Sequence, residues 1–255
     1  MFRVHAIPAL STNYIWCLLD ETKKQMICFD PGDAQPVLDW LDRMQYELIA
    51  ICITHHHWDH TGGLNLLLAH FTDIPVYGPT HDTITQVTHR LVESDQVTLP
   101  LGTFQILEAP GHTHGHIVYF GEQCLFCGDV LFSAGCGRVF EGTMQVMYDS
   151  LMKLKQLPKE TWVYPAHEYT ESNCQFALSL LPDDAGIQAY LEKTRAALAQ
   201  KQISLPSTIE NELQVNLFFR CDDPKLKEAL HQKGFKNLDD PYSVFKALRT
   251  YKDGF

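Results

Sequence analysis

Leu48-Ile49-Ala50-Ile51-Cys52-Ile53-Thr54-His55-His56-His57-Trp58-Asp59-His60 decides the fold, because an apolar run leads directly into four histidines and an aspartate. The run predicts a buried strand. His55 and His57 are two residues apart, so in an extended chain they project to the same side and can share one metal ion. Asp59 and His60 follow a turn and can face a second ion. Imidazole and carboxylate suit zinc, iron or manganese. The alternative is a solvent-exposed histidine-rich loop.

Three further apolar stretches also end in polar residues. His112 follows the stretch 104–107 through a Pro-Gly turn, Asp129 follows the stretch 124–127, and His167 follows the stretch 162–164. A rigid sheet fixes where its loops emerge, and side chains at strand ends therefore gather at one place. Four strands that end in potential ligands predict a metal site rather than a histidine-rich loop.

Composition excludes several classes of protein. The 255 residues are 45% hydrophobic and 20% charged, which is typical of a soluble globular chain. The formal net charge of −11 disfavours nucleic acid as a partner. No apolar run approaches the roughly 20 residues that a membrane helix needs. The N-terminus has no long apolar stretch typical of a signal peptide, and most of the eight cysteines lie in apolar segments. We therefore expect a cytoplasmic protein with free, buried thiols.

The hydrophobic pattern changes near residue 170. Strand-like and helical stretches alternate before it, and helical periodicity dominates after it, over residues 171–181, 184–200, 224–233 and 241–251. This order predicts an α+β fold in which two sheets pack face to face with helices outside, an αββα sandwich. We expect a catalytic domain over residues 1–169 and an all-helical, substrate-binding domain over residues 170–255.

Together these motifs resemble a known family. Thr-His-x-His-x-Asp-His at 54–60, then Gly111-His112-Thr113, Gly128-Asp129 and the late His167 are similar to the binuclear metal signature of metallo-β-lactamase-fold hydrolases. The segments 128–138, 165–170 and 245–252 resemble glyoxalase II, the hydroxyacylglutathione hydrolases. The resemblance extends over nearly the whole chain, and it implies a four-layer metallo-β-lactamase sandwich with a C-terminal helical domain.

The resemblance implies two divalent ions per chain, zinc first, with iron or manganese as alternatives. One ion is expected on His55, His57 and His112, the other on Asp59, His60 and His167, with Asp129 bridging the two. Among the alternating histidines 112, 114 and 116, the position in the Pro-Gly-His-Thr turn favours His112. Asp59 and Asp129 are the expected catalytic residues.

The expected reaction is thioester hydrolysis. Two divalent ions lower the pKa of a bridging water towards neutrality, which provides a hydroxide nucleophile that Asp59 can orient. A thiol with a pKa near 8.5 leaves as thiolate with little general-acid help. The resemblance implies S-D-lactoylglutathione and related S-2-hydroxyacylglutathiones as substrates, cleaved to glutathione and D-lactate in the second step of methylglyoxal detoxification.

Glutathione carries two carboxylates, so a basic surface is expected to bind it. The resemblance points to five substrate-binding residues: Arg138, Phe140, Tyr169, Arg249 and Lys252. Terminal Lys and Arg side chains are more often simply solvated. Two departures from the family pattern concern substrate binding, namely Phe140 where tyrosine is usual and the missing proline before Phe218. The expected partner is a small glutathione thioester, with no nucleic acid and no membrane, and we expect a monomer.

Other functions remain open at this point. A glutathione persulfide dioxygenase of the same fold uses a single iron and does not need Asp59, His60 and His167 as a complete second set. A β-lactamase-type hydrolase lacks the basic helical tail, and an RNA-processing relative is disfavoured by the charge. A non-catalytic, metal-stabilised binder of glutathione conjugates is the alternative outside enzymology. Structural zinc sites usually close their coordination with four protein ligands, which favours catalysis here.

Overall fold

Two mixed β-sheets form the centre of the computed structural model, which describes residues 2–255. The first sheet contains six strands in spatial order: β1 (Arg3–Ala9), β2 (Asn13–Asp20), β3 (Gln25–Phe29), β4 (Glu47–Cys52), β5 (Val76–Pro79) and β6 (His89–Leu91). Its first three strands are antiparallel, and β3 to β6 are parallel. A turn at residues 21–24 joins β2 to β3.

The second sheet has the order β14 (Ser207–Thr208), β13 (Trp162–Pro165), β10 (Cys124–Gly128), β9 (Ile117–Gly121), β8 (Gly102–Glu108) and β7 (Gln96–Leu99). Only β10 and β13 pair in parallel. A short hairpin, β11 (Leu131–Phe132) and β12 (Gly135–Cys136), follows β10. Since β8 and β10 are both antiparallel to β9, the strands β8, β10 and β13 all end at the same edge.

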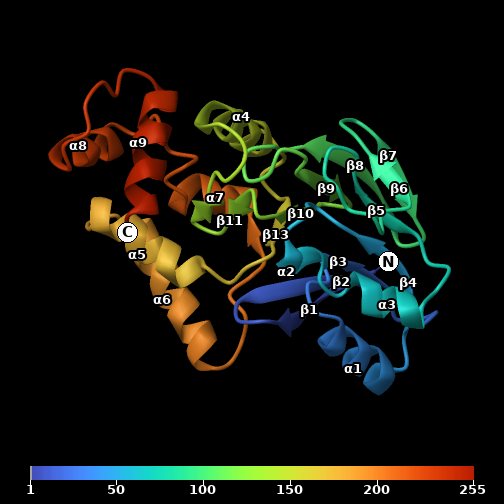
Figure 1. Ribbon diagram of the computed structural model, residues 1–255. Coiled ribbons are helices and arrows are strands. Elements are labelled where there is room, and N and C mark those ends of the chain that lie inside the picture. The colour runs from blue at the N-terminus through green and yellow to red at the C-terminus, as the bar shows by residue number, and fades with distance from the viewer. Residues whose placement is uncertain (1) are drawn as a thin grey trace.

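Alternation along the strands builds separate cores on the two faces of each sheet. Tyr14, Trp16 and Leu18 of β2 lie in the core between the sheets, whereas Ile15 and Cys17 face the helices outside. A strand buried on both faces needs a continuous apolar run, which explains the composition of β2 and β4. The helices on the outer face of the first sheet are α1 (Ala34–Met44) and α3 (Leu64–His70) (Figure 1). The short helix α2 (Trp58–Thr61) follows β4 directly after His57.

The outer face of the second sheet packs against α4 (Met144–Lys155) and the C-terminal helices, which share one large apolar core. These helices are α5 (Thr170–Leu180), α6 (Ala185–Ala199), α7 (Ile209–Val215), α8 (Pro224–Gln232) and α9 (Pro241–Asp253). They gather at the end of the sandwich where β11 and β13 emerge (Figure 1). The predicted αββα sandwich with a C-terminal helical domain is confirmed.

Two elements of the C-terminal part were not predicted. The strand β14 pairs antiparallel with β13, so the helical part adds a two-residue strand to the second sheet, and α7 follows it directly. Both are too short to give a periodic signal. The boundary between residues 169 and 170 stays a prediction. Within residues 2–255, no helix has the length and apolar character to span a bilayer, and all eight cysteines are free and buried.

Candidate metal centre

The metal-ligand candidates lie where four strands end. His55 to His60 follow β4, His112 follows β8, Asp129 follows β10 and His167 follows β13. The two sheets meet at this edge, because Tyr14 N–H donates to the Ala166 carbonyl at 2.7 Å. Gly128 precedes Asp129 with φ of +49°, and a Cβ there would come within 2.4 Å of Thr54 Oγ1. Glycine therefore allows β10 to turn Asp129 towards the loop after β4.

The first predicted ligand set converges. The ligand atoms of His55, His57 and His112 all lie within 4.8 Å of one another. His57 Nδ1 and His112 Nε2 are 3.1 Å apart, although the two residues are 55 positions apart in the chain. His55 and His112 are buried, and His57 is partly exposed. Three imidazoles in this arrangement can share one divalent ion, with room left on the side of His57.

The second predicted set converges beside the first. The ligand atoms of Asp59, His60 and His167 also lie within 4.8 Å of one another. Asp59 Oδ2 is 3.3 Å from His167 Nε2 and 3.6 Å from His60 Nε2. One carboxylate oxygen thus faces two imidazole nitrogens, which is the arrangement of a mixed His/Asp site.

Asp129 lies between the two sets and presents one oxygen to each. Its Oδ1 is 3.4 Å from His60 Nε2 and 3.3 Å from His167 Nε2. Its Oδ2 is 3.4 Å from His112 Nε2. A bridging carboxylate in a two-ion site has this disposition.

Several buried atoms at this place have no hydrogen-bond partner among the described residues. Three of them are His55 Nε2, His60 Nε2 and Asp129 Oδ1. Burying a polar atom without a partner is costly, so such atoms together indicate a missing ligand. Each of these three is a metal-donor atom aimed at the same space. The residues present therefore fit a pair of divalent ions.

The other nitrogen of most of these imidazoles contacts an oxygen. His112 Nδ1 donates to the Arg138 carbonyl at 2.8 Å. His60 Nδ1 lies 3.1 Å from Asp30 Oδ2, and His167 Nδ1 lies 3.0 Å from Thr12 Oγ1. Such partners fix the ring orientation of metal-binding histidines and raise their basicity. Asp30 and Thr12 escaped the sequence analysis because neither lies near a ligand in the chain.

Charges in the cluster favour ionised carboxylates. Burial alone would raise the pKa of Asp129, but the imidazoles of His60 and His167 outweigh it and hold that pKa well below its usual range. Burial also opposes ionisation of Asp59, and bonds to His167 and Asn13 lower its pKa to about 2. Both carboxylates are therefore available as ligands at neutral pH.

Two protein-family models match this chain, and together they include all seven candidate ligands. Residues 17–167 match the model of the Metallo-beta-lactamase superfamily, and residues 168–255 match the model described as Hydroxyacylglutathione hydrolase C-terminus. A hydroxyacylglutathione hydrolase of Hamiltonella defensa is 48% identical over 99% of this chain and 100% of that protein. One of Vibrio cholerae is 44% identical over 100% of both chains. The chain belongs to the hydroxyacylglutathione hydrolase family.

Solved structures agree with this assignment at the level of the fold. The BLEG-1 B3 metallo-beta-lactamase aligns with a TM-score of 0.65 and 26% identity, over 86% of this chain and 99% of that one. ETHE1 from Myxococcus xanthus aligns with a TM-score of 0.65 and 25% identity, over 99% of this chain and 98% of that one.

In this member of the hydroxyacylglutathione hydrolase family, the histidines outside the predicted ligand sets have different surroundings. His116 is buried, stacks on His55 and accepts the Asp129 N–H at 3.2 Å, so it supports the centre from behind. His114 is exposed, and its N–H donates to Glu141 Oε2 at 3.0 Å. His56 points away from the centre, and its Nδ1 lies 2.9 Å from the buried Asp82.

Asp82 is a further residue that the sequence analysis missed. Its carboxylate accepts the His56 N–H at 2.9 Å and the Gly115 N–H at 2.9 Å. It also accepts the Thr113 hydroxyl at 3.3 Å. Asp82 thereby ties the loop that carries His55 and His57 to the loop that carries His112.

Arg138 and Phe140 lie beside the first ligand set. The Phe140 ring is 59% exposed, with its centroid 5.3 Å from that of His112 and 5.8 Å from that of His57. The guanidinium of Arg138 lies 5.6 Å from the centroid of the Phe140 ring. An exposed cation and an aromatic face therefore adjoin the proposed ions, as substrate-binding residues require.

Tyr169 is the predicted substrate residue next to the second ligand set. Its ring stacks on His167 with the centroids 4.8 Å apart and the planes within 1° of parallel. It is partly buried, and burial raises the pKa of its hydroxyl above the usual range. The neutral hydroxyl can therefore donate a hydrogen bond throughout the physiological pH range.

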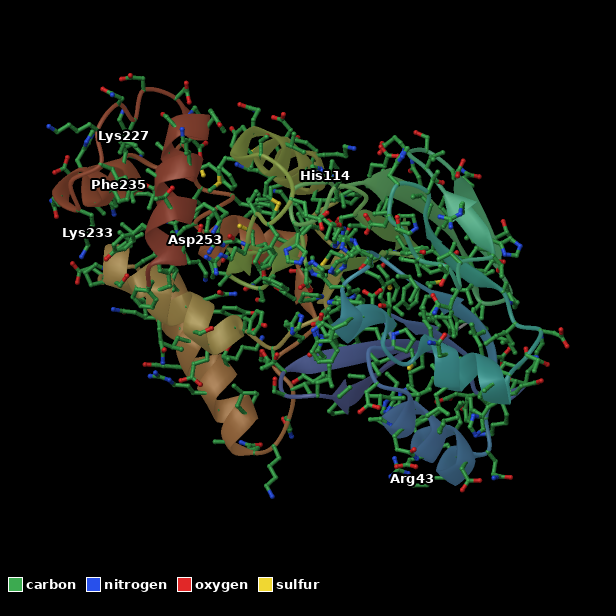
Figure 2. The ribbon with its side chains drawn as sticks, in the orientation of Figure 1. Arg43, His114, Lys227, Lys233, Phe235 and Asp253 are labelled. Carbon is green, nitrogen blue, oxygen red and sulfur yellow. The ribbon has the colours of Figure 1, made fainter. Side chains whose placement is uncertain are left out.

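Arg249 and Lys252 of α9 differ from the solvated pair that the sequence left as an alternative. Arg249 is buried, and its Nη1 donates to the Cys136 carbonyl at 3.0 Å while Nη2 lies 2.9 Å from Asp253 at the end of α9 (Figure 2). Lys252 is partly buried and donates to Asn173 Oδ1. Both side chains turn inward, towards the segment that follows Asp129.

Proposed function

We propose that the chain hydrolyses the thioester of S-D-lactoylglutathione and related S-2-hydroxyacylglutathiones, releasing glutathione and D-lactate as in the second step of methylglyoxal detoxification. The convergence of one three-histidine set and one histidine-aspartate set on Asp129 carries this proposal. Full-length identity to hydroxyacylglutathione hydrolases supports the choice of substrate.

The proposed metal ligands are those that the sequence predicts, His55, His57 and His112 for one ion, Asp59, His60 and His167 for the other, and Asp129 for both. Two divalent ions held there would supply an acidified water and a Lewis acid for the thioester carbonyl. Imidazole and carboxylate donors without thiolate favour zinc and also accept iron or manganese.

Asp59 orients the attacking water in this proposal. The Asn13 amide donates to Asp59 Oδ2 at 3.1 Å and fixes the carboxylate. A carboxylate with a pKa of about 2 stays ionised and accepts a hydrogen bond from water at neutral pH. When the thioester carbon–sulfur bond breaks, the electron pair leaves on sulfur as a thiolate, whose conjugate acid has a pKa near 8.5. No protonating side chain is therefore required.

Substrate binding is assigned to residues around the centre. The exposed Arg138 guanidinium provides positive charge for a glutathione carboxylate, and the adjoining Phe140 ring offers an apolar face. Tyr169 offers a hydroxyl beside His167. Arg249 and Lys252 complete the proposed set from α9.

We also propose a cytoplasmic location, because eight free cysteines suit a reducing compartment. A monomeric state stays a prediction.

Thiol release tests the function against its alternatives. Metal-loaded protein should release thiol from S-D-lactoylglutathione without consuming oxygen, with glutathione persulfide assayed in parallel. Oxygen uptake with the persulfide and no thiol release from the thioester would establish the dioxygenase instead. Tight binding of the thioester without turnover would establish a non-catalytic binder.

A further inference from the structure

The β11–β12 hairpin directly follows Asp129, and side chains of the C-terminal helices hold it. Glu212 of α7 is fully buried, and its carboxylate accepts the Ala134 N–H at 2.8 Å and the Ser133 hydroxyl at 3.0 Å. The Ser207 hydroxyl donates to the same carboxylate. The Tyr190 hydroxyl lies 2.8 Å from Ser133 Oγ and completes the network. Burying a carboxylate costs free energy, and these donors offset that cost. The proposed catalysis does not use Glu212.

Two asparagines bind the carbonyl groups of the same hairpin. Asn216, directly after α7, donates to the Gly135 carbonyl at 2.9 Å and to the Phe132 carbonyl at 3.2 Å, and also to Glu212 at 3.0 Å. Asn173 of α5 donates to the Ser133 carbonyl at 2.9 Å. Polar backbone groups at the tip of the hairpin are thus satisfied by side chains from a different part of the chain.

These hydrogen bonds stabilise a backbone conformation that the hairpin would not favour alone. Ala134 has a φ of +56°, a left-handed conformation that residues with a Cβ seldom adopt. The bond from its N–H to Glu212 fixes this conformation. Gly135 follows, and a Cβ there would come within 2.5 Å of Asn173 Nδ2, so the hairpin lies close against α5.

The backbone directly after β12 contacts the metal centre at two places. A Cβ on Gly137 would come within 1.9 Å of the Asp129 carbonyl oxygen, and the Gly137 N–H donates to the Val130 carbonyl at 3.2 Å. One residue further on, the Arg138 carbonyl accepts His112 Nδ1–H at 2.8 Å. A shift of β12 would therefore move the backbone beside Asp129 and the acceptor that orients His112.

We infer that Glu212 is a positioning residue for the metal centre, which sets the orientation of Asp129 and His112 through the β11–β12 hairpin. The inference rests on the proposed metal centre. It gives the helical part of the chain a second role besides substrate binding, because metal affinity then depends on contacts made by α7.

Glu212→Gln tests this role, with Glu210→Gln on the exposed side of the same helix as the matched control. The amide nitrogen of glutamine is a donor, so it cannot accept all the bonds that the carboxylate accepts. Stepwise zinc dissociation constants are measured by competition with a chromophoric chelator, and visible absorption is recorded on the cobalt-loaded proteins. Urea unfolding identifies the conditions in which each variant is folded.

The expected result for folded Glu212→Gln is about tenfold weaker zinc binding and a changed cobalt spectrum, whereas Glu210→Gln matches the wild type. If Glu212→Gln does not fold, Ser133→Ala removes one bond to the carboxylate and should weaken zinc binding about threefold. Wild-type affinity and spectrum in a folded variant would overturn the inference. A wild-type chain that binds no zinc would instead refute the metal centre itself.

Discussion

Asp30 Oδ2 lies 3.1 Å from His60 Nδ1, and both side chains are buried. The opposite nitrogen of this ring faces Asp129. Asp30 also accepts the Thr54 N–H at 2.7 Å and the Thr54 hydroxyl at 2.7 Å, so the carboxylate is fixed by the residue that precedes the ligand segment. The position of Asp30 therefore determines which nitrogen His60 offers to a metal ion.

Asp30→Asn should weaken the binding of one of two zinc ions by roughly 10- to 100-fold, because the amide is a poorer acceptor for the His60 ring. Chelator competition measures the effect, and the exposed Asp42→Asn provides a control with the same change of charge. Equal loss in both variants would show that net charge, rather than the contact with His60, sets the affinity.

Arg138→Ala should raise KM for the glutathione thioester about fivefold and leave kcat nearly unchanged. An exposed charge contributes up to about 1 kcal/mol to binding an opposite charge, and salt screens it. Steady-state kinetics at low and high ionic strength measure the effect. Arg43→Ala is the control, because Arg43 is on α1, far from α9 and the hairpin (Figure 2). A fall in kcat with constant KM would remove Arg138 from substrate binding.

Phe140→Tyr should lower KM about threefold, because a hydroxyl at this exposed ring adds one hydrogen-bond donor beside the bound substrate. The ring is 59% exposed near Arg138 and His112, so the substitution needs no repacking. Kinetics with S-D-lactoylglutathione measure it. An unchanged KM would mean that the ring offers only apolar contact.

The pH profile of kcat/KM should fall on the alkaline side near the pKa of Lys252. Burial lowers that pKa from its usual value to about 8, so the ammonium is charged below pH 8 and loses its charge as the pH rises through this value. A charged Lys252 attracts the glutathione carboxylates, and kcat/KM should drop on the order of fivefold by pH 9.5. Lys252→Arg keeps its charge and should remove this limb. The same limb in both proteins would assign it to another group.

The same shift has a stability consequence with a definite sign. The folded-state pKa of Lys252 lies below the value of an unfolded lysine, so the unfolded chain binds the proton more tightly. This group therefore opposes folding below pH 8, and its unfavourable contribution disappears as the pH rises towards 10.5.

The fold and the convergence of the candidate metal ligands were predictable because their signals are local. The apolar run before His55 marks a strand, and the spacing of His55, His57, Asp59 and His60 is typical of metal binding. The longer helices of the C-terminal part have clear periodicity. Helices in both parts of the chain begin after a capping aspartate or threonine: Asp33, Thr143, Asp184, Thr208, Asp223 and Asp240.

Residues that support the ligands were not predictable, because their contacts depend on the folded chain. Asp30 contacts a histidine 30 positions later. Asp82 lies in a third loop and accepts hydrogen bonds from the two loops that carry His57 and His112. Glu212 lies in a segment for which the sequence predicted no helix, yet it is completely buried against a hairpin 78 residues earlier. Single polar residues in such positions have no spacing pattern to reveal them.

Titration of the metal-free protein with zinc, with thiol release from S-D-lactoylglutathione measured at each step, tests most directly whether Asp129 joins two ions in a thioesterase. We expect activity to rise with the second equivalent of zinc, and Asp129→Ala to bind fewer than two ions and release no thiol. Full activity at one equivalent, or sustained thiol release by Asp129→Ala, would contradict the binuclear account.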